Sequence, residues 1–548
     1  MKRFLLMSLC VIFCLTSFRA EVYGVNADVS DRESIRMAYK ARIISREQFV
    51  ISSIKAAFTK SDSSAASKSS DTGSGSRELT MLFKEAVENY PAYSDESKAW
   101  VDRFLFRPDS ATNNWPWPPG PYFYLPEPVS VFSPSELDYP NIGGRYTFWY
   151  VTHSTPDSAG VVHAVTPEFV AAVVQAFETS YATTVADMGF MAPLSDLGYP
   201  DNGGDEKRDV YLMNCGAYDI YGYTMPLPGG TSTSSFMVVD NDFVEFATPT
   251  VTAMEAMQVT VAHEFHHGVQ FSINSYADAW IMEATSAWIE SQVYPDVEDN
   301  LQYLNDDSGF FALPHVPLDD DLQWYNAWIF LEYLTIKWGD NTVKTLWDYI
   351  VENPDGITAV SLMLDVLGSD LKTSFTEFAQ KNYSQTDFYP RAEEFNEVYI
   401  ANGVGQTLDN SSVSTRSILT ASPTVDHLAA MYYKFIPGES LVENDGNSLL
   451  VYVNGDDGKS LQATLTVKHP GGSYTEHIIA LDDQNKGYLY VDDFYPDATD
   501  EVVLELINYS MTDDDLGVTV SGGLRLAAVA SGDGGSGSGG CFVESGLR

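Results

Sequence analysis

The chain has 548 residues, of which 44% are hydrophobic and 13% aromatic, enough to build two or three domains with ordinary apolar cores. Its formal charge of −45 argues against nucleic acid and anionic membrane surfaces as partners, because like charges repel. Two of the four cysteines lie within residues 1–27, and the other two, Cys215 and Cys541, are too few for a disulfide framework or a cysteine metal cluster.

Residues 1–27 are predicted to form a secretory signal peptide. Lys2 and Arg3 precede the apolar run FLLMSLCVIFCL, which has the length of a signal rather than of a membrane span. Cleavage after Gly24 or after Ala27 fits the preference for small residues. We therefore expect an exported bacterial protein, secreted or held at the cell surface, whose mature chain has no membrane span.

Residues 28–115 are polar and show a helical pattern, interrupted by the run SDSSAASKSSDTGSGS, which predicts a flexible linker. Two interpretations of this region are open. It is either a propeptide that is removed, or an accessory helical layer that stays with the rest of the chain.

Residues 116–400 are predicted to form the next domain, in which strands and helices alternate. Strand patterns occur in RYTFWYVTH, RDVYLMN and SFMVVDNDF, and a helix pattern in PEFVAAVVQAFETSYATTVADMG. We expect Ser235 to Asp240 to be an edge strand that can pair with an extended peptide backbone. The acidic segment 201–205 with Asp209 is a candidate Ca²⁺ site, although a turn before a strand explains the same residues.

Residues 263–267 read HEFHH, an HExxH motif within a predicted helix. Positions i and i+4 of a helix are about 40° apart, so His263 and His267 can converge on one Zn²⁺ ion. Glu264 follows the first ligand and can act as general base on water at such a site. His266 lies about 100° away from His267 around the helix, and we expect it to have a supporting role.

The helix start and the third ligand follow from the flanking sequence. Thr252 and Glu255 have the spacing of a capping box. The metzincin pattern requires a third His where this chain has Ile273, so a Glu on a second helix, DAWIMEATSAWIESQVYP, is the expected ligand. Glu283 and Glu290 share one face of that helix. Either can be the ligand, and the other can orient a ligand imidazole.

Residues 301–400 are predicted to be mostly helical, with apolar residues at helical spacing in YNAWIFLEYLTIKWG, NTVKTLWDYIV and LKTSFTEFAQKNY. They are expected to close the lower side of a cleft. Tyr325 at the start of the first helix is a candidate hydrogen-bond donor to a reaction oxyanion, and core packing is the alternative interpretation.

Residues 408–525 change to short alternating runs such as AMYYKFIP, SLLVYVNG, LQATLTVKH, YLYVDDF and EVVLELINY, separated by turns, which predicts a β-sandwich. Residues 526–548 form a Gly/Ser-rich tail that carries Cys541 beside Phe542. This tail is either an attachment signal or a disordered end with an incidental thiol.

HEFHHGVQF and WIMEATSAWIE, with the Tyr-rich segment that follows them, resemble a family of secreted bacterial metallopeptidases of gluzincin type. DNGGDEKRDVYL, YGYTMPLPGG and YNAWIFLEYLTIKWG also look like that family, as do the helical N-terminal region and the β-rich tail, so the resemblance covers most of the mature chain. It implies a zincin catalytic domain with His263 and His267 as zinc ligands, Glu264 as catalytic glutamate and Glu283 as third ligand.

These patterns predict an α+β protein. A zincin-like catalytic domain, with a mixed sheet, an active-site helix and a helical lower part, precedes an all-β sandwich domain. The predicted function is a Zn²⁺-dependent endopeptidase that acts on protein or peptide substrates. The alternative is a non-catalytic surface or matrix-binding protein on a zincin-like scaffold, whose β-sandwich binds. The intact His-Glu-His set favours the peptidase, because a scaffold without catalysis has no need of Glu264.

Overall fold

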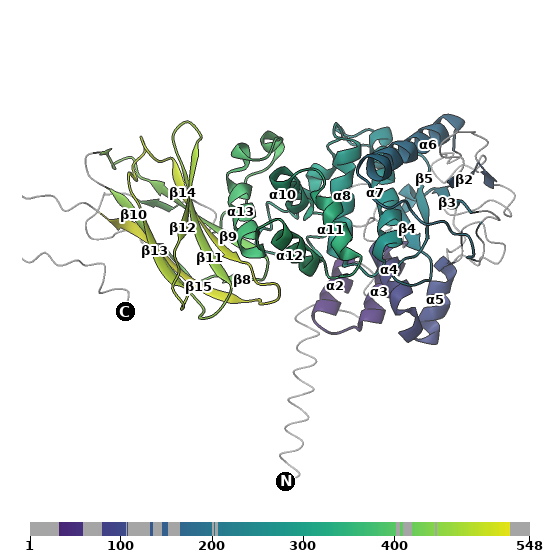
Figure 1. The fold of residues 1–548 in the computed structure, drawn as a ribbon, viewed down its shortest axis with the longest axis horizontal. Helices are drawn as coiled ribbons and strands as arrows, with labels where there is room; N and C mark the ends of the chain where they lie inside the picture. The colour runs from purple at the N-terminus through teal and green to yellow at the C-terminus, as the bar shows by residue number, and fades with distance from the viewer. Residues whose placement is uncertain are drawn as a thin grey trace, which may run out of the picture. The chain divides into compact units, whose positions relative to one another are not determined.

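The structure, a computed structural model, forms two compact units (Figure 1). The residues it describes are 32–58, 79–105, 107, 132–134, 145–151, 165–199, 202, 206–401, 406–408, 419–443 and 447–525. The first unit comprises residues up to 313, 318–374 and 393–396, and the second comprises 314–317, 375–392 and the chain from 397. The predicted signal peptide (1–27), the Ser-rich run (61–76) and the glycine-rich tail (526–548) lie outside the described residues, and the predicted domain boundaries stay predictions.

The N-terminal region is helical where the structure describes it. Ser45 and Gln48 form a capping box that starts the second of its helices, because each side chain bonds the main-chain N–H of the other. The helices are α2 (Arg32–Lys40), α3 (Arg46–Ala57), α4 (Leu79–Asn89), the 3₁₀ turn η1 (Tyr90–Ala92) and α5 (Asp95–Leu105).

A five-stranded sheet forms the centre of the first unit, in the order β1-β2-β3-β5-β4. The strands are β1 (Phe132–Pro134), β2 (Tyr146–Val151), β3 (Arg208–Met213), β4 (Gly222–Pro226) and β5 (Ser235–Asp240). Strands β2, β3 and β5 are parallel, and the outer strands β1 and β4 are antiparallel to their neighbours. The prediction that residues 235–240 form an edge strand is therefore wrong. Every side chain of β5 is buried, as in an interior strand, and the edge is β4.

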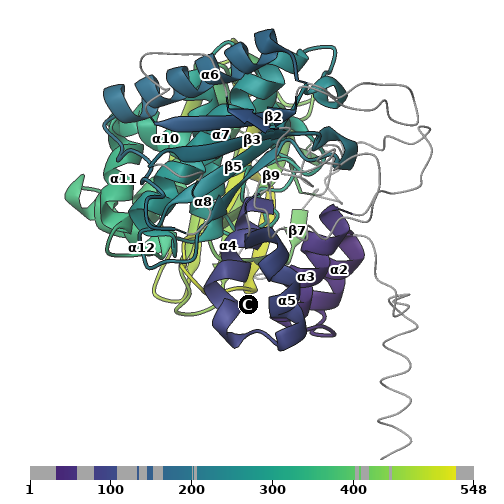
Figure 2. The same ribbon diagram turned by 90° about the vertical axis from the view of Figure 1, so that its right-hand side faces the viewer.

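Helices cover the sheet on two sides (Figure 2). On one side, Phe177 of α6 (Pro167–Tyr181) and Phe265 of α7 (Ala253–Asn274) pack on Tyr146 of β2, with ring centroids 5.2 Å and 6.2 Å from it. On the other side, α3, α4 and α5 share an apolar cluster with the sheet. Its members include Val50, Ile54, Leu79, Phe83, Phe104, Tyr211, Met213, Cys215, Tyr223, Met225, Phe236 and Val238.

The rest of the first unit is mainly helical and confirms the helix patterns of the sequence. Helix α6 continues into the π-helical turn η3 (Ala182–Asp187). The other elements up to residue 394 are η4 (Gly216–Tyr218), η5 (Val244–Phe246), α8 (Ala279–Val293), η6 (Asp299–Leu301), α9 (Gln302–Asn305), α10 (Trp328–Trp338), α11 (Thr342–Ile350), α12 (Gly356–Val366), α13 (Leu371–Tyr383), η7 (Gln385–Asp387) and η8 (Ala392–Glu394). Of these, most of α13 and all of η7 belong to the second unit.

The second unit contains two five-stranded sheets that share one apolar core. One has the order β13-β10-β15-β7 with β8 beside β15, and the other the order β12-β11-β14-β9-β6. Buried and partly exposed side chains alternate along β10, as expected for a strand with one face on a core. The strands are β6 (Gln406–Leu408), β7 (Leu419–Ala421), β8 (Thr424–Val425), β9 (Ala429–Pro437), β10 (Ser448–Gly455), β11 (Leu461–Lys468), β12 (Tyr474–Ile479), β13 (Lys486–Val491), β14 (Glu501–Asn508) and β15 (Leu516–Arg525).

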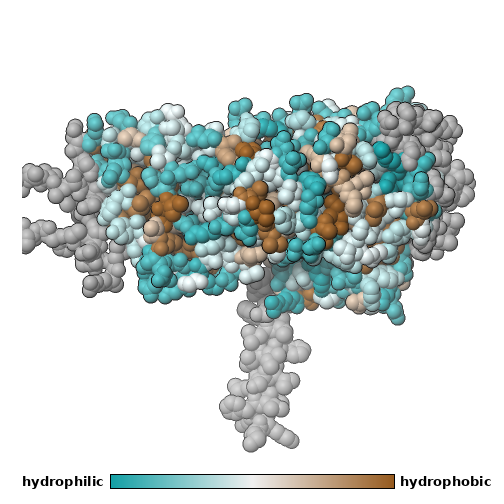
Figure 3. Space-filling model, viewed as in Figure 1, coloured by the Kyte–Doolittle hydropathy of each residue, from teal (hydrophilic) through white to brown (hydrophobic). Residues whose placement is uncertain are grey.

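Helices and sheets together confirm the predicted α+β class. On the face drawn in Figure 3, hydrophobic residues form separate groups among hydrophilic ones. Among the described residues, no helix combines the length and the apolar character that crossing a membrane requires.

Candidate metal centre

The HExxH motif lies in the middle of α7, a helix of 22 residues whose start is the predicted capping box. The Thr252 hydroxyl accepts the N–H of Glu255 at 3.2 Å, and the Glu255 carboxylate accepts the N–H of Thr252 at 2.8 Å. This fixes where the helix begins and therefore which residues face the neighbouring helix α8. The motif is fully buried, because α7 is packed between the sheet and α8.

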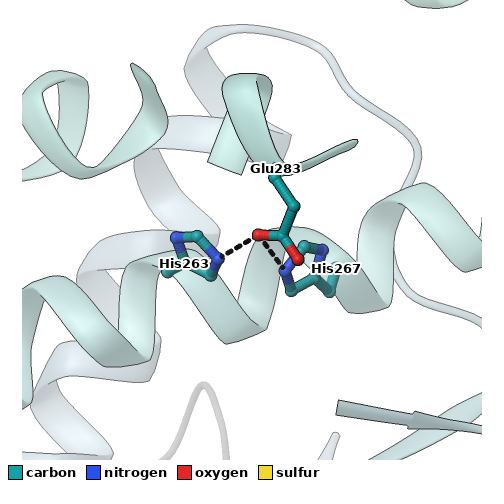
Figure 4. A group of neighbouring side chains, drawn as sticks. All are labelled: His263, His267 and Glu283. Atoms are coloured by element: carbon teal, nitrogen blue, oxygen red, sulfur yellow. Dashed lines mark hydrogen bonds and ion pairs between the residues drawn. The ribbon is translucent and has the colours of Figure 1, made fainter. Parts of the chain in front are cut away.

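His263, His267 and Glu283 converge on one point (Figure 4). The Oε2 atom of Glu283, on α8, lies 3.1 Å from Nε2 of His263 and 3.5 Å from Nε2 of His267. One potential ligand atom from each residue falls within 4.8 Å of the other two. The structure thus brings together the two histidines of the motif and the first of the two candidate glutamates.

Gln270 fixes the tautomer of His267. Its Nε2 atom donates to the Met282 carbonyl at 2.8 Å, so its Oε1 atom must be the one that lies 2.7 Å from Nδ1 of His267. An amide oxygen only accepts, and Nδ1 therefore carries the hydrogen. The Nε2 atom of His267 keeps its lone pair for the point facing Glu283, and within the described chain this buried atom has no hydrogen-bond partner.

Glu290 plays the corresponding part for His263. Its Oε1 atom lies 2.7 Å from Nδ1 of His263, while Nε2 of the same ring faces Glu283. The second candidate glutamate therefore contacts the outer nitrogen of a histidine, as the sequence allowed, and the structure does not place it in the group of three.

The charges of the site favour a cation. Burial alone would lower the pKa of His263, but hydrogen bonds to Glu283 and Glu290 raise its pKa to about 9. Burial would raise the pKa of Glu283, but positive charge on His267 and the hydrogen bond and charge of His263 lower this pKa to about 2. Two buried carboxylates thus stabilise positive charge on the histidines, and a divalent metal ion satisfies the same field.

Glu264 points to the edge strand β4. Its Oε2 atom accepts a hydrogen bond from the Thr80 hydroxyl at 3.2 Å. The Thr224 hydroxyl lies 2.8 Å from the same Oε2 atom and 2.9 Å from the main-chain carbonyl of Glu264, and it donates its one hydrogen between these two acceptors. The Thr80 hydroxyl in turn accepts the main-chain N–H of Thr224 at 2.9 Å. Glu264 and Thr80 are 184 positions apart in the sequence, and the contact joins the N-terminal helical region to the motif helix.

Two aromatic neighbours complete the surroundings of α7. The ring of Tyr325, 6% exposed, stacks on His263 with centroids 5.8 Å apart, so the structure places this predicted residue beside the motif. His266 meets the edge of Phe190 at 5.0 Å, and burial lowers its pKa well below the ordinary value. His266 belongs to the core on the other side of the helix.

The Ca²⁺ prediction concerns residues that are mostly outside the described chain. Asp209, which is described, is buried, forms an ion pair with Arg107 and accepts the indole N–H of Trp149 at 2.7 Å. Asp240, Asp242 and Glu245 form a different acidic group, whose potential ligand atoms lie within 4.8 Å of one another. The carboxylate of Asp240 closes a turn by accepting the N–H groups of Gly216, Asp242 and Phe243 (2.5, 3.1 and 2.7 Å).

Sequence reasoning missed Gln270, Thr224 and Thr80. Gln270 could have been found, because a residue three positions after His267 lies on the same side of the helix. Thr224 and Thr80 reach Glu264 only through the fold, and no spacing in the sequence points to them.

Comparison with known proteins gives one family. Residues 148–438, just over half of the chain, match the profile of a family described as "Family of unknown function (DUF6055)". No curated protein matches the chain.

Solved structures resemble parts of the chain weakly. They include the pre-peptidase C-terminal domain of collagenase from Bacillus anthracis (10% identity, TM-score 0.15, 22% of this chain and 95% of that one). Another is PliG, a periplasmic lysozyme inhibitor of Aeromonas hydrophila (13% identity, TM-score 0.14, 22% of this chain and 96% of that one). These TM-scores are too low to bear on fold or function.

Proposed function

The chain belongs to this family of unknown function (DUF6055), and from the geometry around α7 we propose that it is a zinc-dependent peptidase. The observation that carries the proposal is the convergence of the Nε2 atoms of His263 and His267 with one carboxylate oxygen of Glu283. Catalytic zinc sites typically take three protein ligands of these types and leave a fourth position for water or substrate.

The spacing of the donor atoms fits zinc. Ligands about 2.0–2.1 Å from a tetrahedral ion lie about 3.3 Å from one another. The two distances from Oε2 of Glu283 to the imidazole nitrogens, 3.1 and 3.5 Å, bracket that value. Both imidazoles have their Nδ1 atoms engaged by Glu290 and Gln270, which is the arrangement that orients ligand histidines in zinc enzymes.

The chemistry divides between the ion and the chain. Zinc held by these three residues would polarise a peptide carbonyl and acidify a water molecule. Glu264, one position after a ligand, would take the proton of the attacking water on its carboxylate and hand it to the leaving amine. Thr224 holds the Oε2 atom of Glu264 and so leaves the other carboxylate oxygen to carry the proton. Burial strengthens each of these electrostatic contacts.

The finer features of the fold belong to the same proposal. We interpret the mixed sheet with α7 and α8 as a zincin-like scaffold of gluzincin type, since Glu283 comes from the helix after the motif. The two sheets of the second unit, packed on one core, are interpreted as a β-sandwich. Residues 1–27 would direct the chain out of the cell.

Elemental analysis of the purified chain, together with cleavage of unfolded casein, tests the proposal. We expect one zinc per chain. Glu264→Gln should keep that zinc and lower cleavage by about 10²–10⁴-fold, because only the proton-transfer group is lost. Glu255→Gln is the matched control, since it makes the same change on the same helix and glutamine also completes a capping box.

Each contrary outcome has its own meaning. Zinc with cleavage that does not depend on Glu264 would overturn the mechanism. A chain that takes up no zinc, even after incubation with excess metal, would overturn the peptidase and favour the non-catalytic binding protein.

A further inference from the structure

The N-terminal helical region contacts the candidate active site beside the edge strand β4. Thr80, the second residue of α4, donates a hydrogen bond to Oε2 of Glu264 at 3.2 Å. Its hydroxyl also accepts the N–H of Thr224 on β4 at 2.9 Å. One side chain therefore engages both the group proposed to move protons and the strand that borders the site.

The N–H of Thr224 lies on the open side of β4. In an antiparallel pair, residues alternate between hydrogen-bonded and non-bonded pairs. Tyr221 bonds Asp240 at one end of the β4–β5 ladder and Leu227 bonds Ser234 at the other, so the odd-numbered residues of β4 point their main-chain groups at β5. Thr224 then points its N–H away from the sheet, where an added strand would pair. Thr80 occupies that position.

The metal-ligand group and Glu264 are buried in this arrangement. His263, His267 and Glu283 are 0% exposed and Glu264 is 1% exposed. Leu79 and Met81, which flank Thr80 in the first turn of α4, are 1% and 2% exposed. A peptide bond must reach the metal ligands and Glu264 to be cleaved, so this arrangement and peptide cleavage exclude each other.

We propose that the first turn of α4 is an intramolecular blocker of a zinc peptidase site and that it occupies the free edge of β4 where an extended substrate backbone binds. This inference rests on the proposed function. The chain in this arrangement is latent, and cleavage requires the turn to leave β4, which frees Glu264 and the N–H of Thr224 together.

The rest of the N-terminal layer stays in place during this step. Phe83 and Phe104 of α4 and α5 lie in an apolar cluster with Tyr223 and Met225, whose side chains project from the face of β4 opposite to Thr224. Arg107, just after α5, is buried between Asp196 and Asp209. Loss of the whole layer would expose this core, whereas local opening of one turn leaves it intact. Only the first turn of α4 therefore moves, while the rest of the layer stays packed on the sheet.

A charge placed at Thr80 tests the inference in the full chain. Thr80→Asp brings a second carboxylate against Glu264 in a buried site, where each pKa unit of repulsion shifts the opening equilibrium by about tenfold. Asn89→Asp is the matched control, because it adds the same charge at the exposed end of the same helix. Three quantities are measured: hydrogen exchange of the Thr224 amide, the rate at which dipicolinate removes zinc, and casein cleavage.

We expect Thr80→Asp to raise all three quantities by at least about tenfold and Asn89→Asp to change none of them. Consider first an unchanged chain that cleaves casein. If Thr80→Asp then speeds amide exchange and zinc removal but does not raise casein cleavage, the proposed blocker is overturned. The same result with no cleavage in any zinc-loaded variant would instead overturn the peptidase function, so the two failures are distinguishable.

Circular dichroism would reveal whether Thr80→Asp misfolds, and a second variant tests the inference in that case. Thr80→Val keeps the volume of the side chain but removes both hydrogen bonds, so the Thr224 amide should exchange several-fold faster. Unchanged exchange and unchanged zinc removal in Thr80→Val would overturn the inference.

Discussion

Gln270 and His267 form a pair in which one amide decides the chemistry of one imidazole. The glutamine oxygen lies 2.7 Å from Nδ1 of His267, and the glutamine nitrogen is held at 2.8 Å by the carbonyl of Met282 on α8. The direction of this short chain of hydrogen bonds leaves the lone pair of Nε2 of His267 available to a metal ion. The residue that follows a motif histidine by one helical turn thus determines how that histidine can bind.

Gln270→Leu should weaken zinc binding by about 10–100-fold while leaving the fold intact, because leucine keeps the volume and removes the acceptor. A competitive chelator titration measures this change. Gln175→Leu, at an exposed position of α6, is the control and should bind zinc like the unchanged chain. An affinity unchanged by Gln270→Leu would mean that packing and the Ser286 hydroxyl, 3.3 Å from the same Nδ1 atom, suffice to orient the ring of His267.

Glu283→Gln and Glu290→Gln should separate ligand from supporting carboxylate. Glu283→Gln removes a charged ligand and should abolish stoichiometric zinc, whereas Glu290→Gln loses only the partner of Nδ1 of His263 and should cost about 10–100-fold in affinity. The same titration applied to both variants ranks them. The opposite ranking would exchange the two assignments.

Arg107→Ala should destabilise the first unit by about 3–5 kcal/mol, because it leaves the carboxylates of Asp196 and Asp209 buried without their cation. Urea unfolding followed by fluorescence measures the loss. Arg46→Ala, which breaks the outer ion pair with Glu85 at a side chain that is 46% exposed, should cost less than about 1 kcal/mol. Equal effects of the two changes would show that the inner ion pair adds nothing specific.

Glu505 in the second unit should make stability depend on pH. Burial raises the pKa of this carboxyl to about 8, although the Thr464 hydroxyl bonds it at 2.7 Å. Between the ordinary pKa and this raised value the folded chain holds a proton that the unfolded chain has released. The contribution to stability is therefore fully present below the ordinary pKa and is lost as pH rises through about 8.

Glu505→Gln removes this titration and keeps an acceptor for Thr464. At pH 8 the variant should unfold with a free energy higher by at least about 1 kcal/mol, the equivalent of one pKa unit, and the gain should shrink towards pH 4. Calorimetry across this range gives the measurement. Glu439→Gln, at an exposed position, is the control, and a gain for Glu505→Gln that is the same at every pH would contradict the prediction.

The helices near the motif were predictable because their signals are local. Thr252 and Glu255 mark the start of α7 from three positions apart, and the i, i+4 spacing places His263 and His267 on one side. The order of the strands in the sheet could not be predicted in this way, because it depends on contacts between distant parts of the sequence. The centre of β5, FMVV, is an apolar run of the kind found in interior strands, although the prediction from the sequence is an edge strand there. Strand β4, in contrast, is short, begins with Gly222 and ends with Pro226, as edges often do.

Which of Glu283 and Glu290 lies nearest to both histidines could not be predicted from the sequence. Both lie on one face of α8 seven residues apart, so periodicity treats them alike. Glu283 contacts Nε2 of His263 and Glu290 contacts Nδ1 of the same ring. Which glutamate meets which nitrogen depends on how α8 crosses α7. The contact of Thr80 with Glu264 is further from prediction, because it arises from the packing of α4 against an edge strand 144 residues later.

Cys215 is a natural probe for the opening of the core between the sheet and the N-terminal helices. It is the one cysteine among the described residues and is 0% exposed in the apolar cluster between the sheet and the N-terminal helices, where burial, together with the charge of Asp240, raises the pKa of its thiol well above the ordinary value. An alkylating reagent can modify it only in molecules in which this cluster has opened. The alkylation rate of the native chain, measured on the peptide that contains residue 215, therefore reports how often this core opens.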